Sequence, residues 1–228
     1  RAVALAVAVA VVSGAGWVVM RAAGSASKRD MRVAMVQSCI DPWDNWTRNR
    51  MRFLGELLKY TARAVEHDPG LVIWSESATL EMLSFDFMFG RLNMFEQRLF
   101  ESVRGFARPP ITGEIGRTDD MMNRRAYYHN SAVLIDAQGC VVRAYPKINL
   151  VPFGEFIPRG FGWFVSMMNI PLGEFARGEK VQAPLAIDGQ RVAFDICYED
   201  TFGEELAAQV REGATILVNV SNIAWFGD

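Results

Sequence analysis

The sequence predicts an α/β layered domain preceded by a separate apolar segment. Strand-like and helix-like patterns alternate from residue 31 onward, and hairpin signals interrupt this alternation. In contrast, the first twenty residues carry a charge only at Arg1. At 228 residues, half of them hydrophobic, the chain can bury a sizeable core. We therefore expect residues 1–21 to form a transmembrane helix, residues 22–30 a linker and residues 31–228 one domain.

The N-terminal segment has the length and composition of a membrane span. As a helix, the uncharged residues 2–20 extend over roughly 28 Å, close to the thickness of a bilayer's hydrocarbon core. A secretory signal with a small-residue cleavage region at 22–27, or a buried helix rich in Ala and Val, are alternatives. Because the chain starts at Arg1, we expect it to be cut from a longer protein with further spans. Counted alone, the positive charges after the segment would place the domain in the cytoplasm.

The first half of the domain is expected to alternate strands and helices. Residues 32–37 form a strand, residues 44–65 a helix, residues 71–74 a strand buried on both faces and residues 92–106 a second helix. The second helix has apolar residues spaced by four, and Pro109 follows them. One face of the first helix collects its apolar positions, which are Phe53, Leu54, Leu57, Leu58, Thr61 and Val65.

The second half is expected to be richer in strands. A glycine-containing turn at 136–139 joins two of them as a hairpin. The expected strands are 111–115, 130–135, 140–144, 190–196 and 215–220. A helix at 200–211, with Phe202, Leu206 and Val210 directed inward, separates the last two strands. This order completes the predicted α/β arrangement.

Composition excludes several classes of function. The formal net charge is −2, with 24 basic and 26 acidic residues, and there is no basic stripe or Gly-rich phosphate loop, so nucleic-acid binding is not expected. The three cysteines, Cys39, Cys140 and Cys197, lack CxxC spacing, which argues against a disulfide framework and against a zinc site. We expect neither a metal nor a cofactor.

Three chemically complementary side chains follow strand-like runs. Glu76 comes just after residues 71–74, Lys147 after residues 140–144 and Cys197 after residues 190–196. Cys197 is a candidate nucleophile, Glu76 a base that takes its proton, and Lys147 a cation that stabilises an oxyanion. A helix start and a nearby ammonium would favour the thiolate. The alternatives are a small buried cysteine, a paired carboxylate and a solvated lysine.

Four segments resemble a known family. Residues 74–78, 145–155, 196–200 and 221–228 are similar to the blocks of the nitrilase superfamily, the carbon-nitrogen hydrolases, and more narrowly to the apolipoprotein N-acyltransferase family. The resemblance implies a nitrilase-like α-β-β-α sandwich, with residues 31–228 as a catalytic domain whose C-terminal part is missing.

The resemblance also implies roles for individual residues. Glu76 corresponds to the general base, Lys147 to the oxyanion-stabilising lysine and Cys197 to the acylated nucleophile. Glu155, Tyr198, Glu199 and Trp46 correspond to further residues that support the active site, and Trp46 is matched only by its distance from Gln37.

The activity implied by the resemblance is a two-step acyl transfer. The cysteine takes the sn-1 acyl chain of a phospholipid, typically phosphatidylethanolamine, and the thioester is then attacked by the α-amine of the diacylglyceryl-cysteine of an apolipoprotein. The family works in the bacterial inner membrane with its catalytic domain facing the periplasm, and this implication outweighs the charge count around the span.

Two departures from the family pattern leave activity open. Ser75 stands where the family usually has proline, and Ile223 where it has aspartate. A lipid substrate would suit two apolar clusters that either dip into the membrane interface or pack against the domain. They comprise Phe85, Phe87, Met88 and Phe89, and Phe156, Phe161, Trp163, Phe164, Met167 and Met168.

Two rival functions remain at this point. The first is an amidase that uses the same three residues, with water as the second nucleophile. The second is a membrane-tethered scaffold without catalysis, which the departures at Ser75 and Ile223 suggest.

Overall fold

The computed structural model describes residues 11, 13, 31–37, 46–106, 108, 110–160 and 175–222. The chain divides into two compact units, Arg1–Asp30 and Met31–Asp228. The predicted membrane span and linker lie outside the described residues, apart from Val11 and Ser13, which are helical. No helix within the described residues is both long and apolar enough to cross a membrane.

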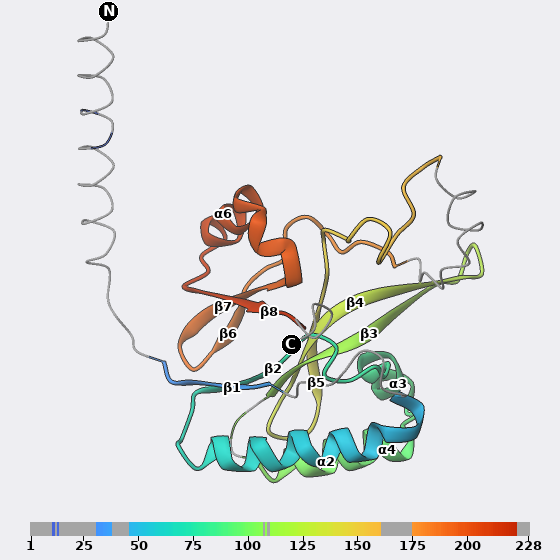
Figure 1. Ribbon diagram of the computed structural model, residues 1–228, viewed down its shortest axis with the longest axis vertical. Helices are drawn as coiled ribbons and strands as arrows, with labels where there is room; N and C mark the ends of the chain where they lie inside the picture. The colour runs from blue at the N-terminus through green and yellow to red at the C-terminus, as the bar shows by residue number, and fades with distance from the viewer. Residues whose placement is uncertain are drawn as a thin grey trace, which may run out of the picture. The chain divides into compact units, whose positions relative to one another are not determined.

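Two sheets form the centre of the second unit (Figure 1). A five-stranded sheet has the order β1-β2-β3-β4-β5, in which β1, β2 and β3 run parallel and the β3–β4 and β4–β5 pairs are antiparallel. A three-stranded sheet has the order β6-β7-β8, with β7 and β8 parallel. The strands are β1 Val33–Val36, β2 Leu71–Trp74, β3 Pro110–Asp120, β4 Arg125–Ile135, β5 Val141–Pro146, β6 Leu185–Ile187, β7 Gln190–Ile196 and β8 Ile216–Val220.

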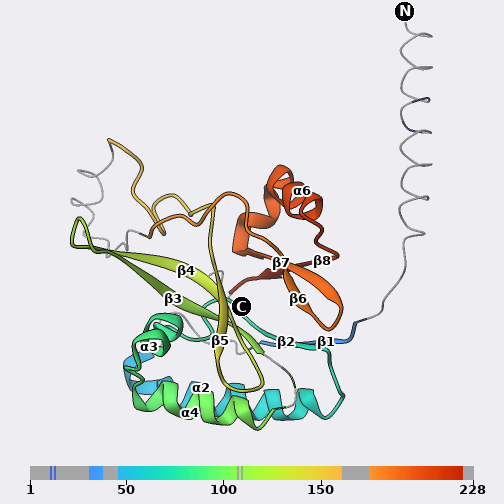
Figure 2. The same ribbon diagram turned by 180° about the vertical axis from the view of Figure 1, so that it is seen from behind.

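Helices cover the outer faces of both sheets. α2 (Trp46–Val65) and α4 (Met94–Arg104) lie side by side along the five-stranded sheet, and α6 (Gly203–Arg211) lies beyond the three-stranded sheet (Figures 1 and 2). A short helix, α3 (Leu83–Phe89), and a 3₁₀ helix, η1 (Cys197–Thr201), complete the unit. The resulting order of layers, α-β-β-α, confirms the predicted fold class of this domain.

Two apolar cores separate these layers. One lies between the five-stranded sheet and the α2–α4 pair, and the other lies between the two sheets. β2 contributes to both, because Val72 and Trp74 belong to the first core, whereas Leu71 and Ile73 belong to the second. Side chains alternate between the faces of a strand, so a strand buried on both faces is apolar throughout. The predicted burial of this strand is confirmed.

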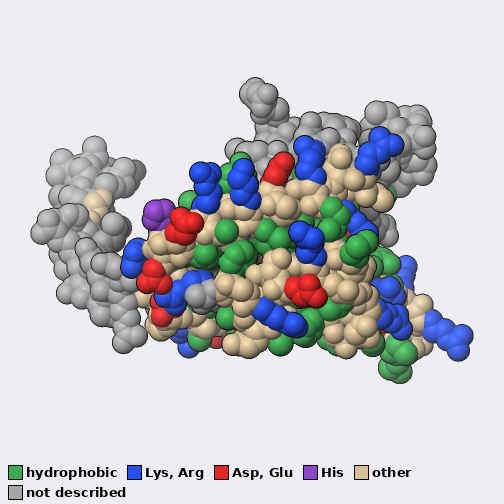
Figure 3. Space-filling model, turned by 90° about the horizontal axis from the view of Figure 1, so that it is seen from below, with side chains coloured by type: hydrophobic (Ala, Val, Ile, Leu, Met, Phe, Trp, Pro, Cys, Tyr) green, Lys and Arg blue, Asp and Glu red, His purple; other side chains and the backbone are tan. Residues whose placement is uncertain are grey.

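The two long helices bury the faces that their periodicity predicts. In α2 the buried residues are Phe53, Leu54, Leu57 and Thr61. In α4, Phe95, Leu99 and Val103 are all buried. Asn93 caps α4 by accepting hydrogen bonds from the N–H groups of Phe95 and Glu96, so the helix begins two residues after the predicted start at residue 92. The opposite faces point to solvent, and Figure 3 shows Lys and Arg side chains spread over this side of the molecule.

Strands β3 and β4 are longer than predicted, and they pair as a hairpin that was not predicted. Each strand has eleven residues and they pair from Ile111 with Leu134 out to Asp120 with Arg125. The outer half mixes exposed and half-buried residues, so it lacks the apolar alternation on which the prediction depended. The turn between β4 and β5 agrees with the prediction, because Gly139 has a φ of 72° and its N–H donates to the Asp136 carbonyl.

Two local predictions differ from the structure. Val210 is exposed rather than inward, because Gln209 occupies the buried position of α6 and donates to the Phe194 carbonyl at 3.0 Å. The first apolar cluster forms α3 instead of a loop, with Phe85 buried and with Met88 and Phe89 exposed. Of the second cluster, only Phe156 lies within the described residues.

Candidate active site

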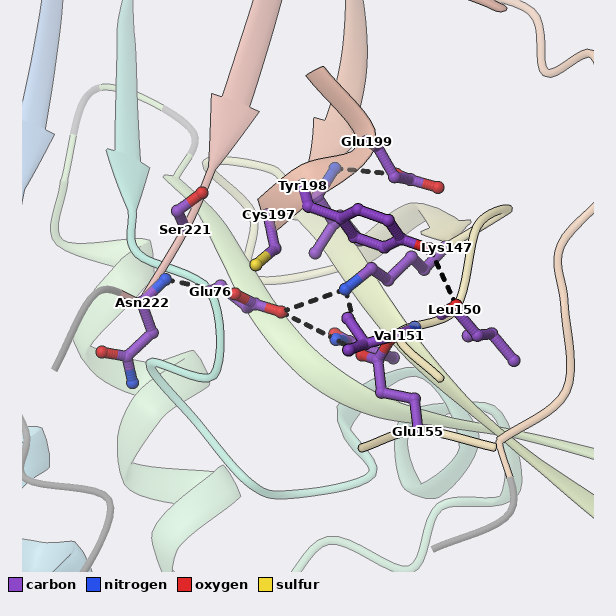
Figure 4. A network of polar contacts seen from close by, with 12 residues as sticks. Glu76, Lys147, Leu150, Val151, Glu155, Cys197, Tyr198, Glu199, Ser221 and Asn222 are labelled. Carbon is purple, nitrogen blue, oxygen red and sulfur yellow. Dashed lines mark hydrogen bonds and ion pairs between the residues drawn. The ribbon is translucent and has the colours of Figure 1, made fainter. Parts of the chain in front are cut away.

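The three candidate reactive residues all follow the ends of strands. Glu76 lies two residues beyond β2, Lys147 directly beyond β5 and Cys197 directly beyond β7. Figure 4 shows the three side chains converging on one place, with the sulfur of Cys197 beside the Glu76 carboxylate. Strand ends from both sheets therefore bring together residues that lie far apart in the sequence, as predicted.

Lys147 connects two carboxylates in the interior. Its side chain is 1% exposed, and its Nζ lies 3.0 Å from Glu155 Oε1 and 3.6 Å from Glu76 Oε1. A buried ammonium needs such partners, because an unpaired charge away from water is very costly. We call Glu76, Lys147 and Glu155 the Lys147 network. Burial acts to lower the pKa of Lys147, but Glu76 and Glu155 outweigh it, so the pKa lies above its ordinary value and the side chain stays charged.

Asn130, on β4, completes this network. Its Nδ2 donates to Glu76 Oε1 at 2.8 Å and to Glu155 Oε1 at 2.6 Å. The remaining oxygens are held by the backbone, because Asn222 N donates to Glu76 Oε2 at 3.1 Å and Val151 N donates to Glu155 Oε2 at 2.8 Å. The position of both carboxylates is therefore determined by hydrogen bonds as well as by Lys147.

Cys197 occupies a special backbone position. Its φ is 59°, in the left-handed region that residues with a Cβ seldom adopt, and it is the first residue of η1. Asn219, on β8, donates from Nδ2 to the Cys197 carbonyl at 2.8 Å and also to the Asp195 carboxylate. An unusual backbone conformation held by its surroundings is a frequent property of functional sites. The thiol is free rather than disulfide-bonded.

The pKa of the thiol reflects opposing effects. Burial of the thiol, together with the negative charge of Glu76, raises the pKa of Cys197 above its ordinary value. Lys147 and the N–H group of Tyr198, at the helix start, lower this pKa as expected, but burial and Glu76 outweigh them. A protonated thiol needs a base at the moment of reaction, and the Glu76 carboxylate is adjacent to it (Figure 4).

Tyr198 and Glu199 support the candidate active site in different ways. The Tyr198 ring covers Lys147 Nζ at 5.7 Å, and its hydroxyl donates to the Leu150 carbonyl at 2.8 Å. Burial raises the pKa of Tyr198. Glu199 is 3% exposed and accepts hydrogen bonds from the N–H groups of Ile196, Ile148 and Asn149, which ties η1 to the segment after Lys147. Glu199 thus acts on the backbone around the site.

Trp46 lies in a different environment. Its Nε1 donates to Glu81 Oε1 at 3.0 Å, and its ring packs against Phe53 and Phe95. Glu81 is also paired with Arg50 at 3.0 Å. The structure therefore connects Trp46 with the α2–α4 layer, and its predicted place near the active site stays a prediction.

Close backbone contacts hold the Glu76 loop against β3. A Cβ added to Gly113 would lie 2.5 Å from Ser77 N, too close for any real side chain. Ser77 itself has a φ of 54°, and the buried Thr79 hydroxyl donates to the Gly113 carbonyl at 2.7 Å. Glycine is required here because the loop approaches β3 closely. This close approach helps to position Glu76 relative to the sheet. Ser75, one of the two departures, is buried, and Ile223 lies outside the described residues.

Asn130, Asn219 and Gly113 were not identified from the sequence. Asn130 has one usable signal, because it is a polar residue where β4 becomes apolar, and buried polar groups need partners. Asn219 and Gly113 offer no such signal, because their roles depend on which residues of neighbouring segments lie opposite them. In the part of the chain that is described, no group of three or more His, Cys, Asp or Glu side chains is placed to hold a metal ion.

Comparison with known proteins identifies the family of this chain. Residues 32–228 match the family model described as carbon-nitrogen hydrolase. The chain belongs to the carbon-nitrogen hydrolase family. Within this family, it is similar to apolipoprotein N-acyltransferase from Ralstonia nicotianae, with 59% identity over 104 residues, covering 44% of this chain and 20% of that protein.

A second curated relative of the same name covers more of the chain. Apolipoprotein N-acyltransferase from Chromobacterium violaceum is 36% identical over 201 residues, which is 87% of this chain and 36% of that protein. The chain thus spans between a fifth and just over a third of the length of these two relatives.

Solved structures share the fold of this carbon-nitrogen hydrolase domain. An amidase from Nesterenkonia sp. matches with a TM-score of 0.57 and 21% identity, covering 84% of this chain and 64% of that one. A carbon-nitrogen hydrolase from Helicobacter pylori matches with a TM-score of 0.55 and 16% identity, over 84% and 59% of the two chains. At these identities the matches show the fold and no more.

Proposed function

We propose that this protein is an apolipoprotein N-acyltransferase. It moves the sn-1 acyl chain of a phospholipid, with phosphatidylethanolamine as the expected donor, to the α-amine of a diacylglyceryl-cysteine on an apolipoprotein. The observation that carries the proposal is the convergence of Cys197, Glu76 and Lys147, in a chain similar over 87% of its length to a relative of that name.

The first step forms a thioester on Cys197. Glu76 removes the thiol proton as Sγ attacks the sn-1 ester carbonyl, and the Lys147 ammonium stabilises the oxyanion that develops. When the C–O bond of the ester breaks, the proton on Glu76 passes to the departing glycerol oxygen, which releases a lysophospholipid. The raised pKa of Cys197 supports this order of events, because the thiol is protonated before the donor binds.

The second step transfers the acyl chain. The α-amine of the acceptor attacks the thioester carbonyl, Glu76 takes the amine proton, and the C–S bond breaks to return the thiol. Glu155, Tyr198 and Glu199 serve as positioning residues, because they hold Lys147 or the backbone around Cys197. Protons and electrons balance without a metal or a cofactor.

The membrane is the proposed location of this reaction. Residues 1–21 have the composition of a span, and both substrates carry acyl chains. We place the catalytic domain on the periplasmic side of the bacterial inner membrane, in keeping with the resemblance described above.

Mass spectrometry of the trapped intermediate tests the proposal. The full-length protein is incubated with phosphatidylethanolamine, and we expect one acyl adduct on Cys197 and none on a Cys197→Ala variant. Addition of a diacylglyceryl-cysteine peptide should then remove the adduct and yield the N-acylated peptide.

Two other outcomes would overturn the proposal. Hydrolysis of small amides, without any acyl adduct from phospholipid, would indicate an amidase. The absence of both activities, under conditions in which the Ralstonia nicotianae relative forms its adduct, would indicate a scaffold without catalysis.

A further inference from the structure

A pocket with two arginines adjoins the proposed active site. Its volume is about 370 Å³, and its lining includes Arg125 and Arg177 together with Tyr127, Leu150 and Phe156. None of its nine lining residues is acidic. In the described part of the chain, neither guanidinium is paired with a carboxylate. Among the described residues, the two positive charges of the pocket therefore have no carboxylate partner.

The same strands and loops form this pocket and the Lys147 network. Leu150 lines the pocket, and its carbonyl accepts the Tyr198 hydroxyl at 2.8 Å. Arg177 Nη1 donates to the Ile148 carbonyl at 3.3 Å, one residue from Lys147. The positive charge of Arg177 also acts to lower the pKa of the Tyr198 hydroxyl. A ligand in the pocket would thus lie beside Leu150, whose carbonyl accepts the hydroxyl of the ring that covers Lys147.

The backbone that carries Arg177 is held firmly in place. Phe175 N donates to the Glu155 carbonyl at 2.9 Å, Ala176 N to the Tyr128 carbonyl at 2.7 Å and Gly178 N to the Lys147 carbonyl at 2.8 Å. A Cβ on Gly178 would lie 2.2 Å from the Pro146 carbonyl oxygen, so only glycine allows this approach.

Both guanidinium groups lie over aromatic rings. Arg177 Cζ lies 5.0 Å from the centre of the Phe156 ring, and Arg125 Cζ lies 5.9 Å from that of Tyr127. Such contacts stabilise a guanidinium while leaving N–H groups at its edge for a ligand. Arginine presents these donors in a planar fork that matches the oxygens of a phosphate.

A second pocket in the domain shows the opposite chemistry. It is about 450 Å³ in volume and is lined by Glu81 and Asp86 among mainly apolar residues, with no arginine or lysine. An anionic headgroup would be repelled there. Of these two cavities, only the Arg125–Arg177 pocket is suited to a phosphate.

We propose that Arg125 and Arg177 bind the phosphate of the donor phospholipid and thereby place its sn-1 ester at Cys197. This inference rests on the proposed function and assigns the headgroup part of that site. In a phospholipid only the glycerol unit separates the phosphate from the sn-1 ester. A phosphate held beside Leu150 therefore keeps the ester close to Tyr198 and Lys147.

The experiment compares two acyl donors in the full-length protein. Phosphatidylethanolamine carries the phosphate, whereas p-nitrophenyl palmitate supplies an acyl ester without one. Each lost charge-assisted contact should lower acylation of Cys197 by the phospholipid about tenfold, mainly through KM, in Arg125→Gln and in Arg177→Gln. Acylation by p-nitrophenyl palmitate should remain as in the wild type, and Arg177→Lys should recover part of the loss. Arg98→Gln, on the exposed face of α4, is the matched control.

Each other outcome has a defined meaning. An equal loss with both donors would show that the arginines support the fold, and no loss with either would show that they do not touch the donor; both results overturn this inference alone. Acylation of the wild type by p-nitrophenyl palmitate but by no phospholipid would overturn the proposed function, and this inference with it.

Competition identifies the source of the phosphate. We expect glycerophosphoethanolamine to inhibit acylation by the phospholipid at lower concentration than inorganic phosphate does, and this inhibition should be lost in the double variant Arg125→Gln and Arg177→Gln. Stronger inhibition by inorganic phosphate would identify a site for the free anion and overturn the assignment to a headgroup.

Discussion

Two groups of carboxylates in the interior differ in what balances their charge. In the Lys147 network, Glu76 and Glu155 share a buried ammonium and the amide of Asn130. The second group, which we call the acidic cluster, consists of Glu81, Asp86 and Glu96, and among the described residues no lysine is paired with it. The two groups show two solutions to the cost of burying a carboxylate.

The acidic cluster relieves part of this cost through the pKa of Glu96. Glu96 is fully buried, and its Oε2 accepts from Asn93 N at 2.8 Å, whereas its Oε1 has no hydrogen-bond partner. Burial, with the nearby Asp86 and Glu81, raises the pKa of Glu96 to about 7. Glu81 forms an ion pair with Arg50. Glu96 is therefore largely neutral below neutral pH.

The Lys147 network instead keeps its charges. Both carboxylates raise the pKa of Lys147 against the effect of burial, so the ammonium remains available to an oxyanion. Acid–base catalysis needs a charged carboxylate beside the thiol, and stabilisation of a transition state needs a fixed cation. The difference between the groups indicates which one is arranged for chemistry and which one serves the fold.

The largest expected effect comes from removing the cation. Lys147→Met leaves two buried carboxylates without a counter-charge, which should destabilise the protein by about 3–5 kcal/mol and lower thioester formation by about 10²–10³. Thermal unfolding and the yield of the acyl adduct measure the two effects. Lys59→Met, at an exposed position of α2, is the control, and an equally small change in both variants would refute the role of Lys147.

The acidic cluster should respond to pH instead. Because the pKa of Glu96 is about 7 in the folded protein and its ordinary value is 4.5, the folded state binds more protons between these pH values, so its contribution to stability falls as pH rises through this window. Glu96→Gln keeps the capping acceptor and removes this loss, by at most roughly 3 kcal/mol at pH 8. Free energies of unfolding at pH 5 and pH 8 should differ less in the variant than in the wild type; identical differences would contradict the assignment.

Two effects of opposite direction on Cys197 are expected when Glu76 is changed. Glu76→Gln removes a negative charge that raises the pKa of Cys197, so alkylation of the thiol by iodoacetamide should begin at lower pH. Acylation by phospholipid should nevertheless fall about a hundredfold or more, because the base is lost. Glu101→Gln, an exposed position on α4, should change neither quantity. If alkylation required higher pH in Glu76→Gln, the carboxylate would not be the cause of the raised pKa.

The sequence predicted the layers and the three reactive residues because both depend on local order. Apolar periodicity located α2 and α4, and the apolar run of β2 located a strand buried on both faces. Glu76, Lys147 and Cys197 were found because each follows such a run, and strand ends in a layered α/β domain come together. The resemblance then supplied their roles.

Features that depend on distant contacts were not predicted. The role of Asn130 requires β4 to lie between the loops of Glu76 and Glu155, and the need for glycine at 113 requires the Ser77 backbone to approach β3. The outer half of the β3–β4 hairpin lacks apolar alternation because it does not belong to either apolar core. The inward face of α6 was misplaced because the polar Gln209 takes the buried position through its hydrogen bond to the Phe194 carbonyl on β7.

By itself, the sequence determined the order of strands and helices, the buried faces of α2 and α4 and the three candidate reactive side chains, since these depend on residue types at short spacing. Only the tertiary structure decided the charge state of the site. Cys197 is protonated and Lys147 is charged because burial and the positions of Glu76 and Glu155 set their pKa values. Electrostatic energies depend on distance and desolvation, and both are properties of the folded chain.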